Sequence, residues 1–332
     1  MTFLHFIITL VLIFDFINGF HDSANSIACI VSTKVLSPLA AVSIAAFFNF
    51  FAYLVFHLKV ASTIGKGVVE TDAININVIG AALIAAITWN LFTWWWGLPS
   101  SSSHTLVGGL IGSAVASSGF GSIITAGVMK IVAFIFIAPA LGFIFSFFLS
   151  SLIMWILRNV PAFAVDKWFR RLQIISASAF SLGHGGNDAQ KSVGIIWVAM
   201  IISGLVTKEA TEPPGWVVVS CYSAIALGTL FGGWRIVKTM GQKITKIKPF
   251  EGFCAEAAGT LTLVGATHWG IPVSTTHTIT GAIMGVGARK RLSAVKWGVT
   301  RNIFWAWILT IPVSAIIGGI MYYFLVWFNP LY

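Results

Sequence analysis

Long apolar stretches, separated by short polar loops, follow one another along the whole chain. They cover residues 2–33, 36–58, 73–118, 124–157, 172–206, 216–235, 251–288 and 297–328. A helix needs about 20 residues to cross the roughly 30 Å hydrocarbon core of a bilayer, so most of these stretches are long enough to span it. The pattern predicts an all-α integral membrane protein and leaves no room for a soluble domain.

Several of these stretches do not have the pattern of a single straight span. Residues 172–206 would form a helix about 50 Å long, and they carry the polar sequence GHGGNDAQK at residues 183–191. We therefore expect a helix that is broken there. Residues 73–118 and 251–288 each have a proline in mid-run, Pro99 or Pro272. Each is expected to begin and end on the same side of the membrane, as a hairpin or as a pair of spans, and periodicity alone leaves both open.

The amino-acid composition agrees with this class of protein and excludes others. Of the 332 residues, 57% are hydrophobic and only 9% are charged, against roughly 25% charged in a soluble domain. The formal charge of +10 resides largely in short loops, so it indicates membrane topology and not nucleic-acid binding. The first apolar stretch has neither a basic leader nor a small-residue cleavage site, and we expect it to be a retained span. The three cysteines are isolated and without metal-ligand spacing, which indicates packing roles.

The chain contains two copies of one pattern. GLPSSSSHTLVGGLIG at residues 97–112 returns as GIPVSTTHTITGAIMG at residues 270–285, and the same register places Pro139 on Pro312. Upstream, GFHDSANSIA at residues 19–28 aligns with GGNDAQKSVG at residues 185–194. This alignment pairs Asp22 with Asp188, and Asn25 with Lys191. We predict two repeats, residues 1–166 and residues 167–332, within one membrane domain.

The distribution of basic residues predicts that the two repeats are inverted relative to each other. Lys and Arg cluster at residues 158–171, 235–248 and 289–296, which are expected to be cytoplasmic. The loops equivalent to the last two clusters in the first repeat are uncharged or nearly neutral. Inverted repeats of this kind are common in secondary transporters. The arrangement predicts about 10 to 12 membrane segments, half-helices included, with both termini outside.

Four acidic residues lie inside apolar stretches, namely Asp15, Asp22, Asp188 and Glu256. An ionisable group in the membrane costs several kcal/mol unless it has a partner or faces water, so such residues are functional candidates by default. Asp22 and Asp188 are the strongest candidates because they occupy equivalent positions. Asp15 has no counterpart in the other repeat, which leaves a structural and a functional interpretation equally open. The case for a functional Glu256 is stronger than that for Asp15 and weaker than that for Asp22 and Asp188.

The polar motifs also predict helix N-termini at membrane depth. HDSAN and NDAQK are expected to start half-helices with Asp22 and Asp188 in N-cap-like positions, and PSSSSHT and PVSTTHT are good helix starts. Four converging N-termini with hydroxyl and amide side chains would form a site for a tetrahedral oxyanion. The two aspartates would repel such an anion, so protons or bridging cations must accompany it. Lys191 supplies one fixed positive charge.

Other functions fit the motifs less well. A Ser/His hydrolase is disfavoured because the serines and histidines lie in a repeated motif and no G-x-S-x-G sequence is present, so we do not expect an enzyme. His104 and His277 are expected to fasten the hairpins and not to bind metal, since no second ligand lies at helical spacing. A passive anion channel remains the alternative, although inverted repeats with charged midplane residues favour alternating access.

The four motifs resemble those of the inorganic phosphate transporter (PiT) family, and the resemblance covers nearly the whole chain. It implies a symporter with inverted repeats, broken helices, two re-entrant hairpins, a phosphate site between them and a homodimeric assembly. The chain lacks the long hydrophilic central loop of animal members, which indicates a prokaryotic member in the inner membrane. The matching positions implicate, in phosphate binding, Asp22, Asn25, Ser101, Ser102, Ser103, Thr105, Asp188, Gln190, Lys191, Ser274, Thr275, Thr276 and Thr278.

Two departures from the family pattern bear on the coupling ion. Glu256 matches a glutamate that the family associates with cation coupling, together with Asp22 and Asp188. However, His21 stands where the motif usually has Asn, and Lys191 stands where sodium-coupled members repeat Asn. An ammonium there can take the place of a bound Na⁺ and repel a second cation. We therefore expect coupling to protons, or uptake of a neutral metal–phosphate complex, with sodium coupling as the alternative.

The choice between phosphate and sulfate as the anion rests on one proton. Some relatives carry sulfate, and hydroxyls with helix N-termini would bind either oxyanion. Phosphate keeps a proton that it can donate to a carboxylate, which sulfate cannot, so two aspartates at the site favour phosphate.

Overall fold

The computed structural model describes residues 2–56, 67–207, 212–268 and 273–328, and these are almost entirely helical. The main helices of the first half are α1 (Thr2–Ser32), α2 (Pro38–Phe51), α4 (Ile76–Trp96), α5 (Ser102–Ser118) and α6 (Thr125–Ile156). Those of the second half are α7 (Ala162–Ile202), α8 (Gly215–Phe231), α9 (Trp234–Lys238), α10 (Pro249–His268), α11 (Thr275–Lys290) and α12 (Trp297–Phe328). The predicted all-α class is confirmed.

Several helices have the length and composition of membrane spans. Within the described residues, α1, α4, α6 and α12 each meet this test, and α8 with the helical segment Trp234–Lys243 forms a fifth span bent by 59°. The bend falls at Gly232 and Gly233, where Gly232 has a φ of +71° that side chains rarely adopt. The segment predicted at 216–235 therefore contains this bend near its C-terminal end. Together these helices make the chain a multi-pass membrane protein.

The expected breaks in α1 and α7 are not present. Both helices run without interruption through Asp22 and Asp188, with 31 and 41 residues. The prediction was wrong because polar side chains inside a membrane can be satisfied by side chains of neighbouring elements, without freeing any backbone groups. Asp22 and Asp188 consequently cap no helix. Of the four predicted N-termini, those of α5 and α11 are present in the described residues.

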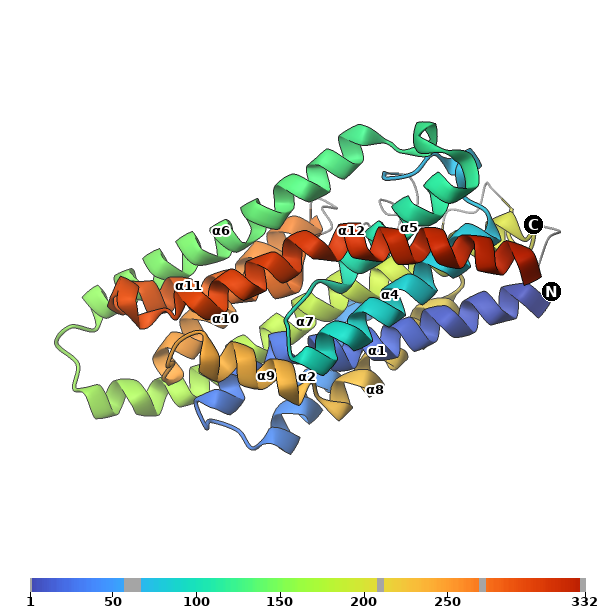
Figure 1. The fold of residues 1–332 in the computed structure, drawn as a ribbon. Coiled ribbons are helices and arrows are strands. Elements are labelled where there is room, and N and C mark those ends of the chain that lie inside the picture. The colour runs from blue at the N-terminus through green and yellow to red at the C-terminus, as the bar shows by residue number, and fades with distance from the viewer. Residues whose placement is uncertain (1, 57–66, 208–211, 269–272, 329–332) are drawn as a thin grey trace.

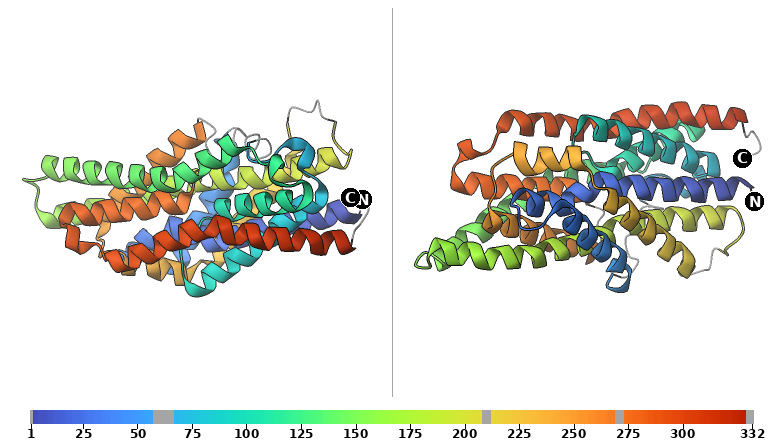
Figure 2. Two further views of the ribbon diagram at one scale, coloured as in Figure 1. Left: turned by 45° about the horizontal axis from the view of Figure 1, so that its top comes forward. Right: turned by 90° about the horizontal axis from the view of Figure 1, so that it is seen from below.

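The two hairpins enter the molecule from opposite ends. In Figure 1, the helices α4 and α5 both reach the end where the chain termini lie, whereas α10 and α11 open toward the opposite end, and Figure 2 shows the same division. Their tips meet beside the middle of α1, where Asn25 donates a hydrogen bond to Thr276 of α11 (2.9 Å) and Ser102 of α5 donates one to Asp22 (3.0 Å). The segments left open above are therefore re-entrant hairpins.

Each hairpin packs against the long helix of the other half of the chain. Helix α5 lies along α12, and α11 lies along α6. Glycines permit the close approach: a Cβ atom at Gly108 would lie 2.5 Å from the Ile311 carbonyl oxygen, and one at Gly281 would lie 2.1 Å from the Pro139 carbonyl oxygen. Gly108 and Gly281 are equivalent in the aligned motifs. The buried Trp307 of α12 also donates a hydrogen bond to the carbonyl of Pro99 (2.9 Å), which anchors the first hairpin tip.

We expect Gly281→Ala to destabilise the protein. The added methyl group would collide with a backbone carbonyl of α6, and overpacking of this kind costs about 1–3 kcal/mol. The matched control is Gly298→Ala at the start of α12, where an added Cβ meets no atom within 4 Å. Thermal unfolding of the two purified variants in detergent measures the difference. An equal midpoint for both variants would show that the hairpin does not depend on this contact.

Candidate functional site

Asp22 is the point at which both hairpin tips meet α1. Its carboxylate is 2% exposed and lies 2.7 Å from Nδ1 of His21. Ser102 of the first hairpin donates to Oδ2 at 3.0 Å, and Thr276 of the second donates to Oδ1 at 3.5 Å. One turn along, Asn25 donates to Thr275 at 3.3 Å as well as to Thr276. The motif of the first repeat therefore binds both hairpins at once.

Asp188 on α7 forms the second half of the cluster together with Lys191. The ammonium of Lys191 lies 2.5 Å from Oδ1 of Asp188, and it also donates to the hydroxyl of Ser103 at the first hairpin tip. Both charged side chains are almost completely buried. Removing two charges from water is tolerated only when they pair closely, because either charge alone would be strongly destabilising at this depth.

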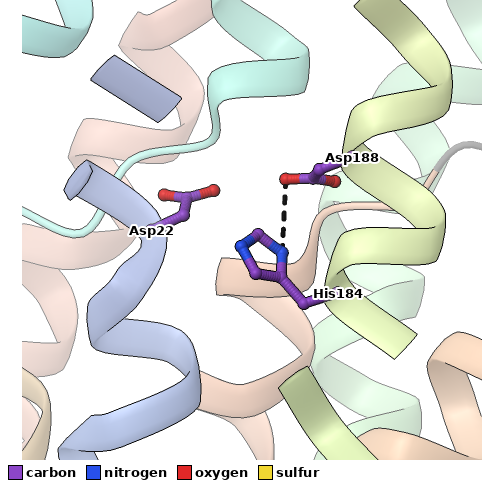
Figure 3. A group of neighbouring side chains, drawn as sticks. All are labelled: Asp22, His184 and Asp188. Carbon is purple, nitrogen blue, oxygen red and sulfur yellow. Dashed lines mark ion pairs between the residues drawn. The ribbon is translucent and has the colours of Figure 1, made fainter. Parts of the chain in front are cut away.

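Asp22, His184 and Asp188 bring carboxylate oxygens and an imidazole nitrogen within 4.8 Å of one another (Figure 3). Nδ1 of His184 lies 3.4 Å from Oδ2 of Asp188. In the described part of the chain neither ring nitrogen of His184 has a hydrogen-bond partner. Figure 3 shows Asp22 on α1 facing Asp188 and His184 on α7 across the site. One nitrogen and two carboxylates are ligands suited to a divalent cation.

The hydroxyl residues of the hairpin tips divide into two groups. Ser101 and Ser274 cap α5 and α11 by accepting hydrogen bonds from the amides of His104 and His277, at 3.3 and 3.2 Å. Thr105 and Thr278 donate back to the carbonyls of Ser102 and Ser274 and so reinforce the first turns. In contrast, Ser102, Ser103, Thr275 and Thr276 point at side chains of α1 and α7. The second group is therefore the one in direct contact with the motif residues.

Gln190 and Glu256 lie apart from this cluster. Gln190 is buried beside Tyr222 of α8. Glu256 of α10 accepts hydrogen bonds from Ser176 at 2.6 Å and from Gln173 at 3.4 Å. Ser176 precedes Asp188 by twelve residues on α7, which corresponds to about 18 Å along a helix. The structure thus places Glu256 in a separate polar cluster with Ser176 and Gln173, in the first half of α7.

Two histidines belong to the site although the sequence interpretation gave them no role in it. His21 contacts Thr93 and Ser100 through Nε2, at 3.2 and 3.4 Å, and holds Asp22 through Nδ1. His184 precedes Asp188 by one helical turn, so its position could have been found from the sequence if α7 had been expected to continue unbroken. His104 and His277 instead pack ring against ring, with centroids 4.8 Å apart, between the hairpins. This contact is ring packing, whereas the expected fastening of the hairpins was by hydrogen bonds.

Two oppositely directed hairpins whose tips close on buried carboxylates in a multi-pass helical protein define the architecture of a secondary transporter. Comparison with known proteins agrees with this class. The profile described as "Phosphate transporter family" matches residues 18–164 and 158–318. The chain therefore belongs to the phosphate transporter family, and its homologues are transporters and not enzymes.

Individual relatives cover almost the whole chain. A probable low-affinity inorganic phosphate transporter of Rhizobium meliloti is 55% identical over 317 residues, which are 96% of this chain and 95% of the relative. One of Bacillus subtilis with the same description is 44% identical and covers 96% of each chain. The solved structure described as "The sodium-dependent phosphate transporter" is 27% identical, with a TM-score of 0.89 and coverage of 98% of this chain and 99% of that chain.

Proposed function

We propose that the protein is a symporter that takes up inorganic phosphate together with protons by alternating access. The observation that carries this proposal is the buried ion pair between Lys191 and Asp188 at the tip of the first hairpin. Lys191 is a fixed cation to which an anion would bind at the hairpin tip. Asp188 is a carboxylate that would lose its cationic partner when the anion binds to Lys191. One residue pair therefore supplies both an anion-binding group and a proton-binding group.

The anion would lie between the hairpin tips, against the N-termini of α5 and α11. Both N-termini carry partial positive charge and free amides, and Ser102, Ser103, Thr275 and Thr276 surround the same space with hydroxyls. Asp22 would accept a hydrogen bond from the proton that phosphate retains. A fully ionised anion such as sulfate has no proton to donate, so the sulfate permease alternative is disfavoured. A passive anion channel is disfavoured as well, because both hairpin tips are bonded to buried motif residues.

Competition for Lys191 provides the coupling in this proposal. When a phosphate oxygen pairs with the ammonium of Lys191, Asp188 becomes a buried carboxylate without a cation. A proton then neutralises Asp188. The neutral assembly of anion, ammonium and protonated carboxyl can then be exposed to the other side. A relative of known structure is described as sodium-dependent. Sodium coupling is therefore the direct alternative, and in that case a cation and not a proton would neutralise Asp188.

A second candidate cargo is a neutral complex of phosphate with a divalent cation. It is supported by the converging ligand atoms of Asp22, His184 and Asp188. A metal held there would neutralise both carboxylates and bridge them to a phosphate oxygen. Binding of phosphate that requires a divalent cation, measured on the purified protein with and without chelator, would favour this cargo over phosphate alone.

The coupling ion can be identified with the purified protein in liposomes. We expect an inward pH gradient, acidic outside, to drive accumulation of labelled phosphate at equal sodium concentrations, because the ammonium of Lys191 occupies the cation position. A sodium gradient at equal pH should drive none. Liposomes without protein give the background, and an ionophore that collapses the pH gradient should abolish uptake. Accumulation driven by sodium alone contradicts proton coupling while leaving phosphate transport intact.

Assembly and orientation complete the proposal. The protein would act as a homodimer in the inner membrane of a prokaryote. Both termini lie at one end of the molecule (Figure 1), and the basic residues Arg170 and Lys290 lie in the segments near the other end. The positive-inside rule then places the termini outside the cell.

A further inference from the structure

Asp15 is a buried carboxyl of the membrane interior that neither the proposed anion site nor the hairpin tips use. It lies near the middle of α1, and its side chain is 0% exposed. The hydroxyl of Ser192 on α7 donates to Oδ1 of Asp15. Ser192 follows Lys191 directly and lies one helical turn, about 6 Å, beyond Asp188. Asp15 therefore sits immediately beside the central ion pair, on the side toward the chain termini.

Among the described residues, no cation near Asp15 is free to balance a negative charge, because Lys191 already has partners. In the described residues, Oδ2 accepts no hydrogen bond from nitrogen or oxygen donors, and the weakly donating thiol of Cys221 lies beside it. The ammonium of Lys191 is already held by Asp188 and Ser103. A buried carboxylate with one hydroxyl donor and no paired cation costs far more than the neutral acid. A negative charge on Asp15 would therefore have no partner of its own in the described residues.

Helix α8 seals this carboxyl from water. A Cβ atom at Gly228 would lie 2.0 Å from the carbonyl oxygen of Phe16, so the backbones of α8 and α1 are in direct contact next to Asp15. The other titratable groups that face Asp15 are few. Helix α7 presents Asp188 and Lys191, and α8 presents Cys221 and Tyr222. Helices α2 and α4 carry no ionisable side chain.

The remaining charged groups of neighbouring helices lie farther along α1 or α7. Helix α9 meets α1 near Phe20 and His21, and α11 meets it at Asp22 and Asn25. Glu256 of α10 contacts Ser176, which lies sixteen residues before Ser192 and so about 24 Å away along α7. Lys191 and Asp188 are consequently the only charged pair close enough to sense Asp15 strongly among the described residues.

We infer that Asp15 binds a further proton, besides the one proposed for Asp188, and couples it to the anion, a role that rests on the phosphate symport proposed above. The coupling is electrostatic and needs no direct proton path to the anion. A phosphate bound at Lys191 would be repelled by an ionised Asp15 about one helical turn away and tolerated by a protonated one. By linkage, the proton strengthens phosphate binding as much as phosphate strengthens proton binding. On release of phosphate, Asp15 gives up its proton to the same side.

Asp15→Asn tests this role, because asparagine imitates the protonated acid permanently. In proteoliposomes of the full-length protein, we expect exchange of labelled for unlabelled phosphate without a gradient to stay within about threefold of wild type. Accumulation driven by a pH gradient should fall at least tenfold, in line with coupling factors of about 5- to 150-fold. As pH rises, phosphate affinity of the wild type should fall relative to that of the variant, and this ratio cancels the titration of phosphate itself.

The control is Asp15→Glu, which keeps a titratable group and should retain accumulation driven by pH. Wild-type accumulation by folded Asp15→Asn overturns the inference, and so does loss of exchange together with accumulation. If Asp15→Asn does not fold, Asp15→Glu carries the test, since folded protein that exchanges phosphate without any pH dependence contradicts the role. Failure of the wild type to bind or transport phosphate at all would instead remove the proposed function on which the inference rests.

Discussion

Asp188→Asn is expected to reduce phosphate uptake by roughly 100-fold while the protein remains folded and inserted. The substitution preserves size but removes the negative charge that holds Lys191 at 2.5 Å. The ammonium of Lys191 then has no fixed position for the anion, and a 100-fold loss of uptake corresponds to about 2.8 kcal/mol. The amide imitates the protonated acid and cannot ionise when phosphate leaves, so the empty state keeps an unpaired buried ammonium and cannot return across the membrane.

The initial rate of labelled-phosphate uptake into proteoliposomes measures this effect. The matched control is Asp166→Asn on the same helix, where the carboxylate is 46% exposed and pairs with Arg170 one turn away. Exposed pairs of this kind contribute little, about 0–1 kcal/mol, so the control should transport normally. Size-exclusion chromatography in detergent establishes that both variants are folded. Uptake by Asp188→Asn at the rate of the control would remove Asp188 from the mechanism.

The architecture could be predicted from the sequence because it depends on repetition and charge. The register that aligns Gly108 with Gly281 in sequence also describes how α5 packs on α12 and α11 packs on α6. The prolines in mid-run and the asymmetric basic loops predicted hairpins that open in opposite directions. Each of these signals is local or repeats at a fixed spacing, so one sequence is enough to read them.

Whether α1 and α7 are broken or continuous could not be predicted in the same way. A run such as NDAQK in an apolar helix is compatible with a break that exposes backbone groups, and equally with an intact helix whose side chains find partners elsewhere. The partners of Asp188 and Lys191 include Ser103, which is far away in sequence. Nothing within the motif indicates that contact. For the same reason, the sequence does not show that Glu256 of α10 lies apart from the site. Its hydrogen-bond partners Gln173 and Ser176 belong to α7, which is far away in sequence.

The functional set that the motifs predicted was also broader than the set that contacts the motif residues of α1 and α7. Ser101 and Thr105 match the family pattern as well as Ser102 and Ser103 do, but their hydroxyls serve the first turn of α5. Three or four consecutive hydroxyl residues at a helix start point in different directions, since successive residues are about 100° apart around the axis. The motif therefore predicts which segment forms the hairpin tip. The geometry of the helix start determines which of its side chains contact α1 and α7.

Lys191→Asn is expected to make phosphate binding dependent on sodium. The substitution gives the second motif the residue that the first has at the equivalent position, Asn25. Asp188 would then be a buried carboxylate without a cation, which is strongly unfavourable. In choline buffer, phosphate affinity should fall at least tenfold, in proportion to a loss of about 1.4 kcal/mol or more. Sodium should restore much of it, because carboxylate and amide oxygens are ligands that hard cations prefer.

Binding of labelled phosphate to the purified protein, in sodium and in choline at constant ionic strength, measures this switch. Lys167→Asn provides the matched control, since Lys167 is exposed on the same helix and its loss changes the net charge equally. The wild type and the control should bind phosphate equally in both buffers, because their buried ammonium already fills the cation position. Equal binding of Lys191→Asn in sodium and choline would show that the ammonium does not stand in for a metal ion. Proton coupling would then have to rest on the carboxylates alone.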